Sequence, residues 1–231
     1  MSYKIIVVSC DKNKDLWLPF HLCIEKYWKG HPEIIYSTET LVNPYYKTIC
    51  RKLPLDYWTK RVADTIRDLP CKHILLTIDD LFIRDYVNNQ EIEDLCELVR
   101  GNIAALNFEF SFDRKDKHYT ITKYGKEIYK RNRQGKFKLS CMCQLWQKRL
   151  LTCLLECNCN DPWQFEKDNI ALDFDFLISK DGNLLNWGKP KIGWHWGIVK
   201  GKWTKECKEF LDKEGIEMNY EERGFIEDGT E

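Results

Sequence analysis

Short apolar runs recur along the N-terminal half of the chain and predict buried strands. Continuous aliphatic and β-branched stretches occupy residues 3–9 (YKIIVVS), 33–37 (EIIYS) and 73–78 (HILLTI). Runs of this length without polar alternation are typical of strands that are covered on both faces, as in a parallel sheet. Polar residues follow at once, with Ser-Cys-Asp after the first run and Asp-Asp after the third.

Amphipathic helices are predicted between and after these strands. Apolar residues recur three and four positions apart over residues 16–28, 58–69 and 91–99. In the segment 58–69 the apolar positions are expected to face the core, so that Arg61 points elsewhere. Because strand and helix alternate, the pattern predicts an α/β fold with a doubly wound, mostly parallel sheet flanked by helices.

The C-terminal half follows a less regular pattern. Residues 103–112 predict a strand, residues 145–155 an apolar helix, and residues 205–214 a charged amphipathic helix that closes the chain. The segment 161–167 (DPWQFEK) predicts a short helix capped by its first aspartate, with Trp and Phe anchoring the turn. Residues 113–138 carry ten Lys or Arg against three acidic residues, a net charge of +7, and are interpreted as a loop.

Charge limits the classes of partner. The whole chain has 36 basic and 36 acidic residues, so no global field attracts nucleic acid or an anionic membrane. A nucleic-acid partner is not expected, since the aromatic residues of the basic segment 113–138 follow no stacking motif. The hypotheses for that segment are a solvated loop or a peripheral contact with an anionic ligand or membrane surface.

Cysteine usage and hydropathy indicate the compartment. The N-terminal apolar run is too short for a signal peptide, and no stretch approaches the length of a membrane span. The eleven cysteines are an odd number in a chain without an export signal, so we expect reduced thiols and a cytoplasmic location. The spacings of Cys141, Cys143, Cys153, Cys157 and Cys159 match no zinc motif, which favours buried thiols.

Asp79 and Asp80 end the third predicted strand. Two adjacent aspartates are consistent with a plain strand end, in which one caps the next segment. They are also consistent with a divalent cation held by hard oxygen ligands. In a doubly wound sheet, ligands bind beyond the carboxyl ends of the strands, where both aspartates and Ser9 are expected to lie. That placement favours a metal site.

Two further features carry candidate chemistry. Glu166, in the first turns of the helix at 161–167, is either an acid that complements the helix dipole or a general base at the mouth of a pocket. The stretch GWHWGIVKGKW over residues 193–203 combines glycines, tryptophans and lysines, and lysines can neutralise phosphate. Within it, His195 is either a third metal ligand or a histidine packed between two tryptophans.

An ordered set of motifs resembles a group of bacterial and large-virus glycosyltransferases with the GT-A fold. The set begins with IIVVSCDKNKDLWLPFHLCIEKYW and continues through WTKRVADTI, LLTIDDLFI, QLWQKRLLTCLL and DPWQFE. It ends with GIVKGKWTKECKEFLDKEGI and the pair Arg223-Gly224. The motifs span nearly the whole chain and occur in the same order as in the group. The resemblance therefore depends on the ordered set and not on any single motif.

The resemblance implies a hexosyltransferase-type enzyme that transfers a sugar from a nucleotide-sugar donor, such as a UDP-sugar, to a glycan or glycolipid acceptor. It implies a single GT-A-like domain over residues 1–231, in which residues 1–100 bind the donor and residues 101–231 form the acceptor side with a C-terminal closing loop and helix. Inverting enzymes of this fold commonly place an acid at a helix start, and Glu166 has such a position, so the resemblance favours inversion of the sugar's configuration.

The resemblance also implies roles for individual residues. Mn²⁺ or Mg²⁺ would be held by one or both of Asp79 and Asp80 and by His195. Glu166 would deprotonate the acceptor hydroxyl. The remaining implied contacts are with the base, ribose or diphosphate of the donor, and they come from Ser9, Asp11, Arg61 and Lys202.

Two other classes remain open from the residues alone. One is a non-catalytic scaffold that binds a nucleotide or sugar through the same strand ends. The other is a metal-dependent nuclease or phosphoesterase that uses Asp79 and Asp80, although the sequence shows no further acids at the spacing of a two-metal site.

Overall fold

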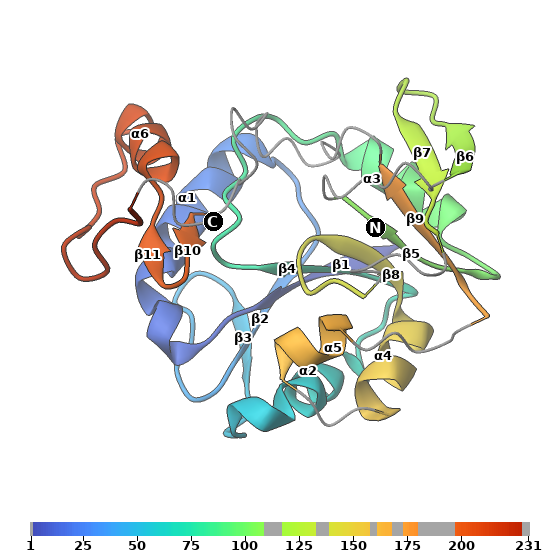
Figure 1. Cartoon of the computed structure of the whole chain (residues 1–231), viewed down its shortest axis with the longest axis horizontal. Helices are drawn as coiled ribbons and strands as arrows, with labels where there is room; N and C mark the ends of the chain where they lie inside the picture. Colours follow the sequence, from blue (N-terminus) through green and yellow to red (C-terminus); the bar gives the residue numbers. More distant parts are fainter. Residues whose placement is uncertain are drawn as a thin grey trace.

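A nine-stranded mixed sheet forms the centre of the molecule, with the strand order β3-β2-β1-β4-β8-β5-β9-β7-β6 (Figure 1). The structure, a computed structural model, describes residues 2–108, 117–132, 139–157, 161–167, 173–179 and 197–227. The strands are β1 (Tyr3–Val8), β2 (Ile34–Thr38), β3 (Lys47–Cys50), β4 (His73–Ile78), β5 (Ile103–Asn107), β6 (Lys117–Ile121), β7 (Glu127–Lys130), β8 (Gln144–Gln147) and β9 (Asp175–Ser179).

The direction of the strands brings many of their carboxyl ends to one edge of the sheet. β1 pairs in parallel with β2 and β4, β2 with β3, and β5 with β9. β8 lies between β4 and β5 and is antiparallel to both, and β7 is antiparallel to β9 and β6. The predicted α/β fold with a mostly parallel sheet is therefore confirmed.

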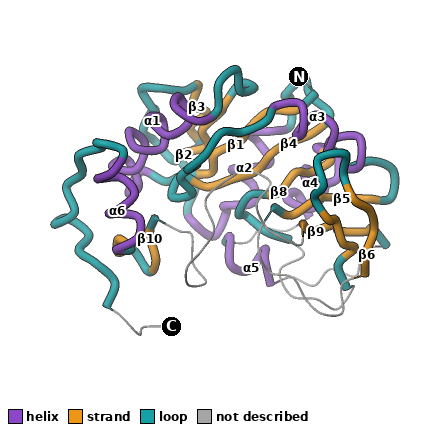
Figure 2. The backbone as a smooth tube through the Cα atoms, turned by 90° about the horizontal axis from the view of Figure 1, so that it is seen from above, coloured by secondary structure: helices purple, strands orange, loops and turns teal. Residues whose placement is uncertain are grey.

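Helices cover both faces of the sheet (Figures 1 and 2). Alternate residues of β1 divide between two cores: Ile5 and Val7 pack into one, Ile6 and Val8 into the other. The first core includes side chains of α1, α3 and α6, and the second includes side chains of α2, α4 and α5. The helical elements are η1 (Asp11–Leu16), α1 (Trp17–Tyr27), η2 (Leu55–Tyr57), α2 (Trp58–Ile66), α3 (Asn89–Leu98), α4 (Lys148–Cys157), α5 (Pro162–Lys167) and α6 (Lys205–Lys213).

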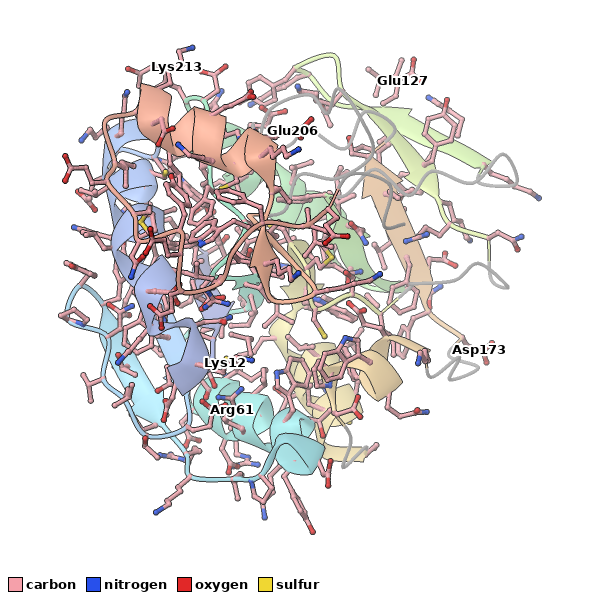
Figure 3. The ribbon with its side chains drawn as sticks, turned by 60° about the vertical axis from the view of Figure 1, so that its left-hand side comes forward. Lys12, Arg61, Glu127, Asp173, Glu206 and Lys213 are labelled. Carbon is pink, nitrogen blue, oxygen red and sulfur yellow. The ribbon has the colours of Figure 1, made fainter. Side chains whose placement is uncertain are left out.

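The C-terminal segment packs beside α1 at one end of the sheet (Figures 1 and 2). It consists of a hairpin of β10 (Ile198–Val199) and β11 (Lys202–Trp203), then α6, then an irregular stretch. Figure 3 labels Glu206 and Lys213 in the first and last turns of α6. The stretch after α6 returns to the hairpin, because Trp203 forms backbone hydrogen bonds with Gly224 and Ile226.

Several predicted elements are corrected by the structure. Residues 145–147 belong to β8 and not to a helix, because they fill the gap between β4 and β5. The part of the basic segment 113–138 that the structure describes is largely a hairpin, β6 and β7, and not a loop. The strand that begins at Ile103 ends at Asn107. The strands β3 and β9 were not among the predicted elements.

None of the helices in the described ranges has the length and apolar character needed to cross a bilayer.

Candidate functional site

The site lies where the adjacent parallel strands β1 and β4 end. Their register pairs Val8 with Ile78, so the residues that follow, Ser9 and Asp79, leave the sheet side by side. Asp79 is almost completely buried. The Ser9 hydroxyl donates a hydrogen bond of 2.5 Å to Asp79 Oδ2 and accepts one of 2.8 Å from the indole Nε1–H of Trp17. Hydrogen bonds from Trp17 to Ser9 and from Ser9 to Asp79 therefore join the two strand ends.

Asn13, in η1, occupies the other oxygen of Asp79. Its Nδ2 amide donates a 3.1 Å hydrogen bond to Asp79 Oδ1. Burial raises the pKa of Asp79 to about 6, and the hydrogen bonds from Ser9 and Asn13 limit that rise. Because both of its oxygens accept hydrogen bonds within the chain, the Asp79 carboxylate is held in a fixed orientation.

Asp80, in contrast to Asp79, has a carboxylate oxygen without a partner in the described part of the chain. Its Oδ1 atom is buried and has no hydrogen-bond partner among the described residues. Burial, and then the neighbouring charge of Asp79, raises the pKa of Asp80 to about 8. A buried carboxylate oxygen without a partner costs free energy that a bound cation would recover. Of the two aspartates, Asp80 therefore has the oxygen that is available to a metal.

Arg223 approaches this pair from the far end of the chain. Its guanidinium forms an ion pair with Asp15, in which Nε lies 2.7 Å from Asp15 Oδ2. Its Nη2 donates a hydrogen bond of 3.1 Å to the Oδ1 of Asn13. Its positive charge partly offsets the raised pKa values of Asp79 and Asp80. Asn13 thus links Arg223 on one side to Asp79 on the other.

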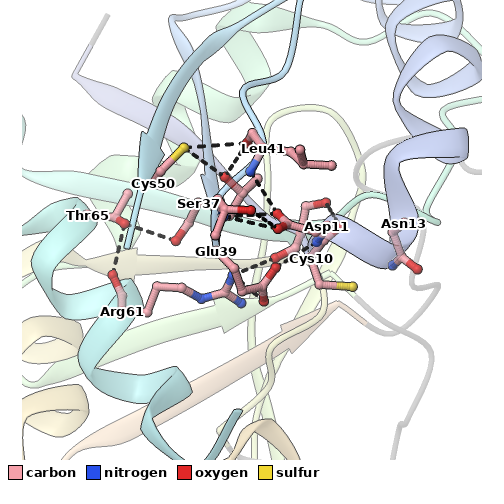
Figure 4. Close-up of polar contacts among 12 residues, drawn as sticks. Cys10, Asp11, Asn13, Ser37, Glu39, Leu41, Cys50, Arg61 and Thr65 are labelled. Carbon is pink, nitrogen blue, oxygen red and sulfur yellow. Dashed lines mark hydrogen bonds and ion pairs between the residues drawn. The ribbon is translucent and has the colours of Figure 1, made fainter. Parts of the chain in front are cut away.

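Asp11 and Arg61 meet through Glu39, which follows β2 (Figure 4). Arg61 Nη1 donates to Glu39 Oε1 at 2.8 Å and to the backbone carbonyl of Ser9 at 2.9 Å, and Glu39 Oε2 accepts from the Asp11 amide at 2.6 Å. Arg61 is only 3% exposed. The prediction that it points away from the core is wrong, because the carboxylate of Glu39 and the carbonyl of Ser9 satisfy its charge inside the protein.

The Asp11 carboxylate organises the loop after β2. It accepts hydrogen bonds from the hydroxyl and backbone amide of Thr40 and from the amide of Leu41 (Figure 4). Although burial by itself raises the pKa of Asp11, these hydrogen bonds hold it below its ordinary value. Asp11 is therefore an ionised group that fixes the entrance to the strand ends of β1 and β2.

Glu166 is anchored at the same edge of the sheet. Its Oε1 accepts a 2.8 Å hydrogen bond from the backbone amide of Cys141. β8 begins at Gln144, which pairs with Leu76 near the end of β4, so the segment that leads into β8 lies at the edge of the sheet where β4 ends. Burial raises the pKa of Glu166, opposed by the Cys141 amide. The α5 helix thus holds a carboxylate of raised proton affinity near the carboxyl end of β4.

Trp163 differs from the prediction that it anchors the turn of α5. Phe165 has that role, fully buried against Trp58. Trp163 is 60% exposed, whereas the other tryptophans of the described segments are at most 4% exposed. A helical spacing of three residues places Trp163 and Glu166 on neighbouring positions of one face.

The residue before the C-terminal hairpin contacts Asp80 through its backbone. The amide of Gly197 donates a 2.8 Å hydrogen bond to the carbonyl of Asp80, and a Cβ at this position would lie 2.4 Å from the ring of Phe82. Lys202 is exposed on β11, where it pairs with Val199, and its side chain makes no hydrogen bond or ion pair within the described ranges. The predicted metal ligand His195 lies outside the described residues.

A divalent cation would need ligands beyond the chain segments described. No group of three or more His, Cys, Asp or Glu residues that could hold a metal occurs among them. Asp80, with its unpartnered oxygen, and the adjacent Asp79 fit a site of the Mg²⁺ type, in which one or two carboxylates act together with substrate phosphates and water.

No protein-family model and no curated protein sequence matches this chain. Solved structures with a similar course of the chain include a cytidylyltransferase from Leptospira borgpetersenii, with 13% identity over 72% of this chain and 68% of that one and a TM-score of 0.42. Residues 1–349 of S. aureus TarS in complex with UDP give 13% identity, 78% and 57% coverage, and a TM-score of 0.44. The bifunctional IspDF from Campylobacter jejuni has 10% identity over 80% of this chain and 51% of that one, with a TM-score of 0.44. The chain thus spans about half to two thirds of the length of these solved chains.

Proposed function

We propose that this protein is a metal-dependent glycosyltransferase that moves a sugar from a nucleotide-sugar donor to a glycan or glycolipid acceptor. The observation that carries the proposal is the buried, unpartnered Oδ1 of Asp80 beside Asp79, whose carboxylate is fixed by Ser9 and Asn13. A plain strand end needs no such arrangement, because two adjacent aspartates facing solvent would be hydrated.

The donor side is built from the ends of β1, β2 and β4. Asp79 and Asp80 would hold Mn²⁺ or Mg²⁺, which when bound neutralises charge on a leaving nucleoside diphosphate. Ser9 fixes the orientation of Asp79, and Asp11 fixes the loop that begins at Thr40. Arg61 supports the turn after β1 through the Ser9 carbonyl, so we assign it a positioning role and not a contact with the donor.

The acceptor side is built from α5 and the segment before β8. Glu166 has a raised pKa and is held by the Cys141 amide, which suits a general base that accepts the proton of the acceptor hydroxyl. Trp163 supplies an exposed aromatic face beside it. Because such a face carries partial negative charge, it attracts the polarised C–H groups of a sugar ring.

The testing experiment is thermal unfolding against a panel of nucleoside diphosphates and nucleotide sugars, with and without Mn²⁺. A ligand at about a hundred times its dissociation constant adds roughly 2.7 kcal/mol to the free energy of unfolding. We expect a shift that requires both a nucleotide and Mn²⁺ and that disappears in Asp80→Ala. If no nucleotide raises the unfolding temperature, the transferase proposal is wrong.

A further inference from the structure

Arg223 is the basic side chain that the described structure brings into electrostatic reach of both aspartates. The Asn13 side chain bridges it to Asp79, because its Oδ1 accepts from Arg223 Nη2 and its Nδ2 donates to Asp79 Oδ1, each at 3.1 Å. The charge of Arg223 also lowers the pKa of both aspartates. Lys202, in contrast, is exposed on the hairpin, and its side chain makes no polar contact among the described residues. Arg61 is already occupied by Glu39 and the Ser9 carbonyl.

The guanidinium of Arg223 is fixed on one side and available on the other. Its Nε and Nη2 groups bind the Asp15 carboxylate, the Lys12 carbonyl at 3.2 Å and the Asn13 amide oxygen at 3.1 Å. The hydrogen bonds of this side chain to the described residues all use Nε or Nη2 and none uses Nη1, although an arginine has two N–H donors at Nη1. Because the side chain is only 8% exposed and is held by these hydrogen bonds, its position is fixed before any ligand binds.

The charges around this group define the ligand. Asp15 balances Arg223, and a divalent cation would balance Asp79 and Asp80 when both are ionised, so the assembled site would be close to neutral. A diphosphate brings further negative charge and several acceptor oxygens. Arginine suits such oxygens because its planar N–H groups donate charge-assisted hydrogen bonds in a fixed geometry.

We propose that Arg223 binds the diphosphate of the nucleotide donor through Nη1, while Nε and Nη2 hold the side chain against η1. The proposal rests on the function proposed above and adds a residue to the donor site. It also assigns the C-terminal segment a direct part in donor binding, through an arginine that follows α6 and not through the lysine of β11.

The test compares ligand affinities in the full-length chain by titration calorimetry with Mn²⁺ present. The probes are inorganic pyrophosphate, UDP and UMP, since the first needs no base and the last two differ by one phosphate. In Arg223→Gln we expect about ten- to a hundredfold weaker binding of pyrophosphate and UDP, from the loss of a charge-assisted hydrogen bond. The preference for UDP over UMP should shrink, and Arg223→Lys should restore part of it.

Two controls separate binding from a structural role. Asp15→Asn removes the ion pair but keeps the guanidinium, so it should lower stability and retain the preference for UDP over UMP. Lys208→Gln removes one positive charge from α6, where Lys208 pairs with Asp212, and should change none of the affinities.

The outcomes are distinguishable. If wild type binds UDP and pyrophosphate and Arg223→Gln binds them equally well, Arg223 is a structural residue and this inference fails while the transferase proposal stands. If wild type binds neither probe, the inference fails as well, and the nucleotide panel then decides the fate of the transferase proposal.

Discussion

Gly197 and Asp80 are joined by a backbone hydrogen bond of 2.8 Å that connects the C-terminal hairpin to the end of β4. The approach is close enough that a Cβ on Gly197 would lie 2.4 Å from Phe82 and 3.1 Å from the Asp80 carbonyl oxygen. The backbone of Asp80 is thus positioned from a segment more than a hundred residues away in the sequence.

Gly197→Ala should destabilise the protein by about 1–3 kcal/mol, the usual cost of overpacking a well-filled site. Chemical denaturation measures the loss. Because the nearest atom belongs to the Phe82 side chain, Phe82→Leu should relieve part of the clash. The double variant is therefore expected to lose less than the sum of the two single losses. Strict additivity would show that the contact is absent in solution.

The aspartate pair should make the metal-free protein less stable as the pH rises. In the folded protein the pKa of Asp79 is raised to about 6 and that of Asp80 to about 8, from an ordinary value of 3.8. Protonation of a group whose pKa is higher in the folded protein stabilises the folded protein. This stabilisation is complete below the pKa of the group in the unfolded chain and is lost as the pH rises through its pKa in the folded protein. With a chelator present, the free energy of unfolding should fall by at least about 2 kcal/mol between pH 5 and 8.

Asp80→Asn is the control for this pH dependence. It removes the group with the higher pKa, so the decline between pH 6 and 8 should largely disappear. Mn²⁺ should restore the stability of wild type at pH 8 and should leave Asp80→Asn unchanged. A variant that declines as steeply as wild type would refute the assignment.

Glu166→Gln should reduce the rate of transfer by roughly 10²- to 10⁴-fold, the usual contribution of a general base. Donor affinity should not change, and stability should change little, because the glutamine oxygen can still accept from the Cys141 amide. Steady-state kinetics with saturating donor measures the rate. Glu156→Gln, which breaks only an exposed ion pair with Arg67, is the matched control. Full activity of Glu166→Gln would exclude this residue as the base.

Trp163→Ala should raise the KM for the acceptor by about tenfold, since an exposed aromatic anchor typically contributes 1–2 kcal/mol to binding. The donor KM and the kcat at saturating acceptor should stay within about twofold. Stability should change by less than about 0.5 kcal/mol because the side chain is largely exposed. Trp163→Phe should retain most of the acceptor affinity. An unchanged acceptor KM would place the acceptor elsewhere.

The sequence predicted those elements whose apolar pattern is local. β1, α1, β2, α2, β4 and α3 all lie within a few residues of their predicted ranges, because a buried strand or an amphipathic helix carries its own periodicity. The position of Asp79 and Asp80 at a strand end followed from the same pattern. β8 was mistaken for the start of a helix because its apolar residues run directly into α4, and only pairing with β4 and β5 decides its conformation.

The contacts of the site were decided by the tertiary structure. No local signal distinguishes Asn13 or Glu39 from other polar residues, and the sequence marked Arg223 only as part of a motif, without a role. Each acquires its role from a partner far along the chain. Arg61 was expected to point away from the core because helical spacing reports which face is apolar, not whether a buried charge finds a partner. The sequence by itself determined the strand ends at which chemistry can occur. Folding determined which oxygens are occupied there, since hydrogen bonds from distant segments satisfy Asp79 and leave one oxygen of Asp80 without a partner.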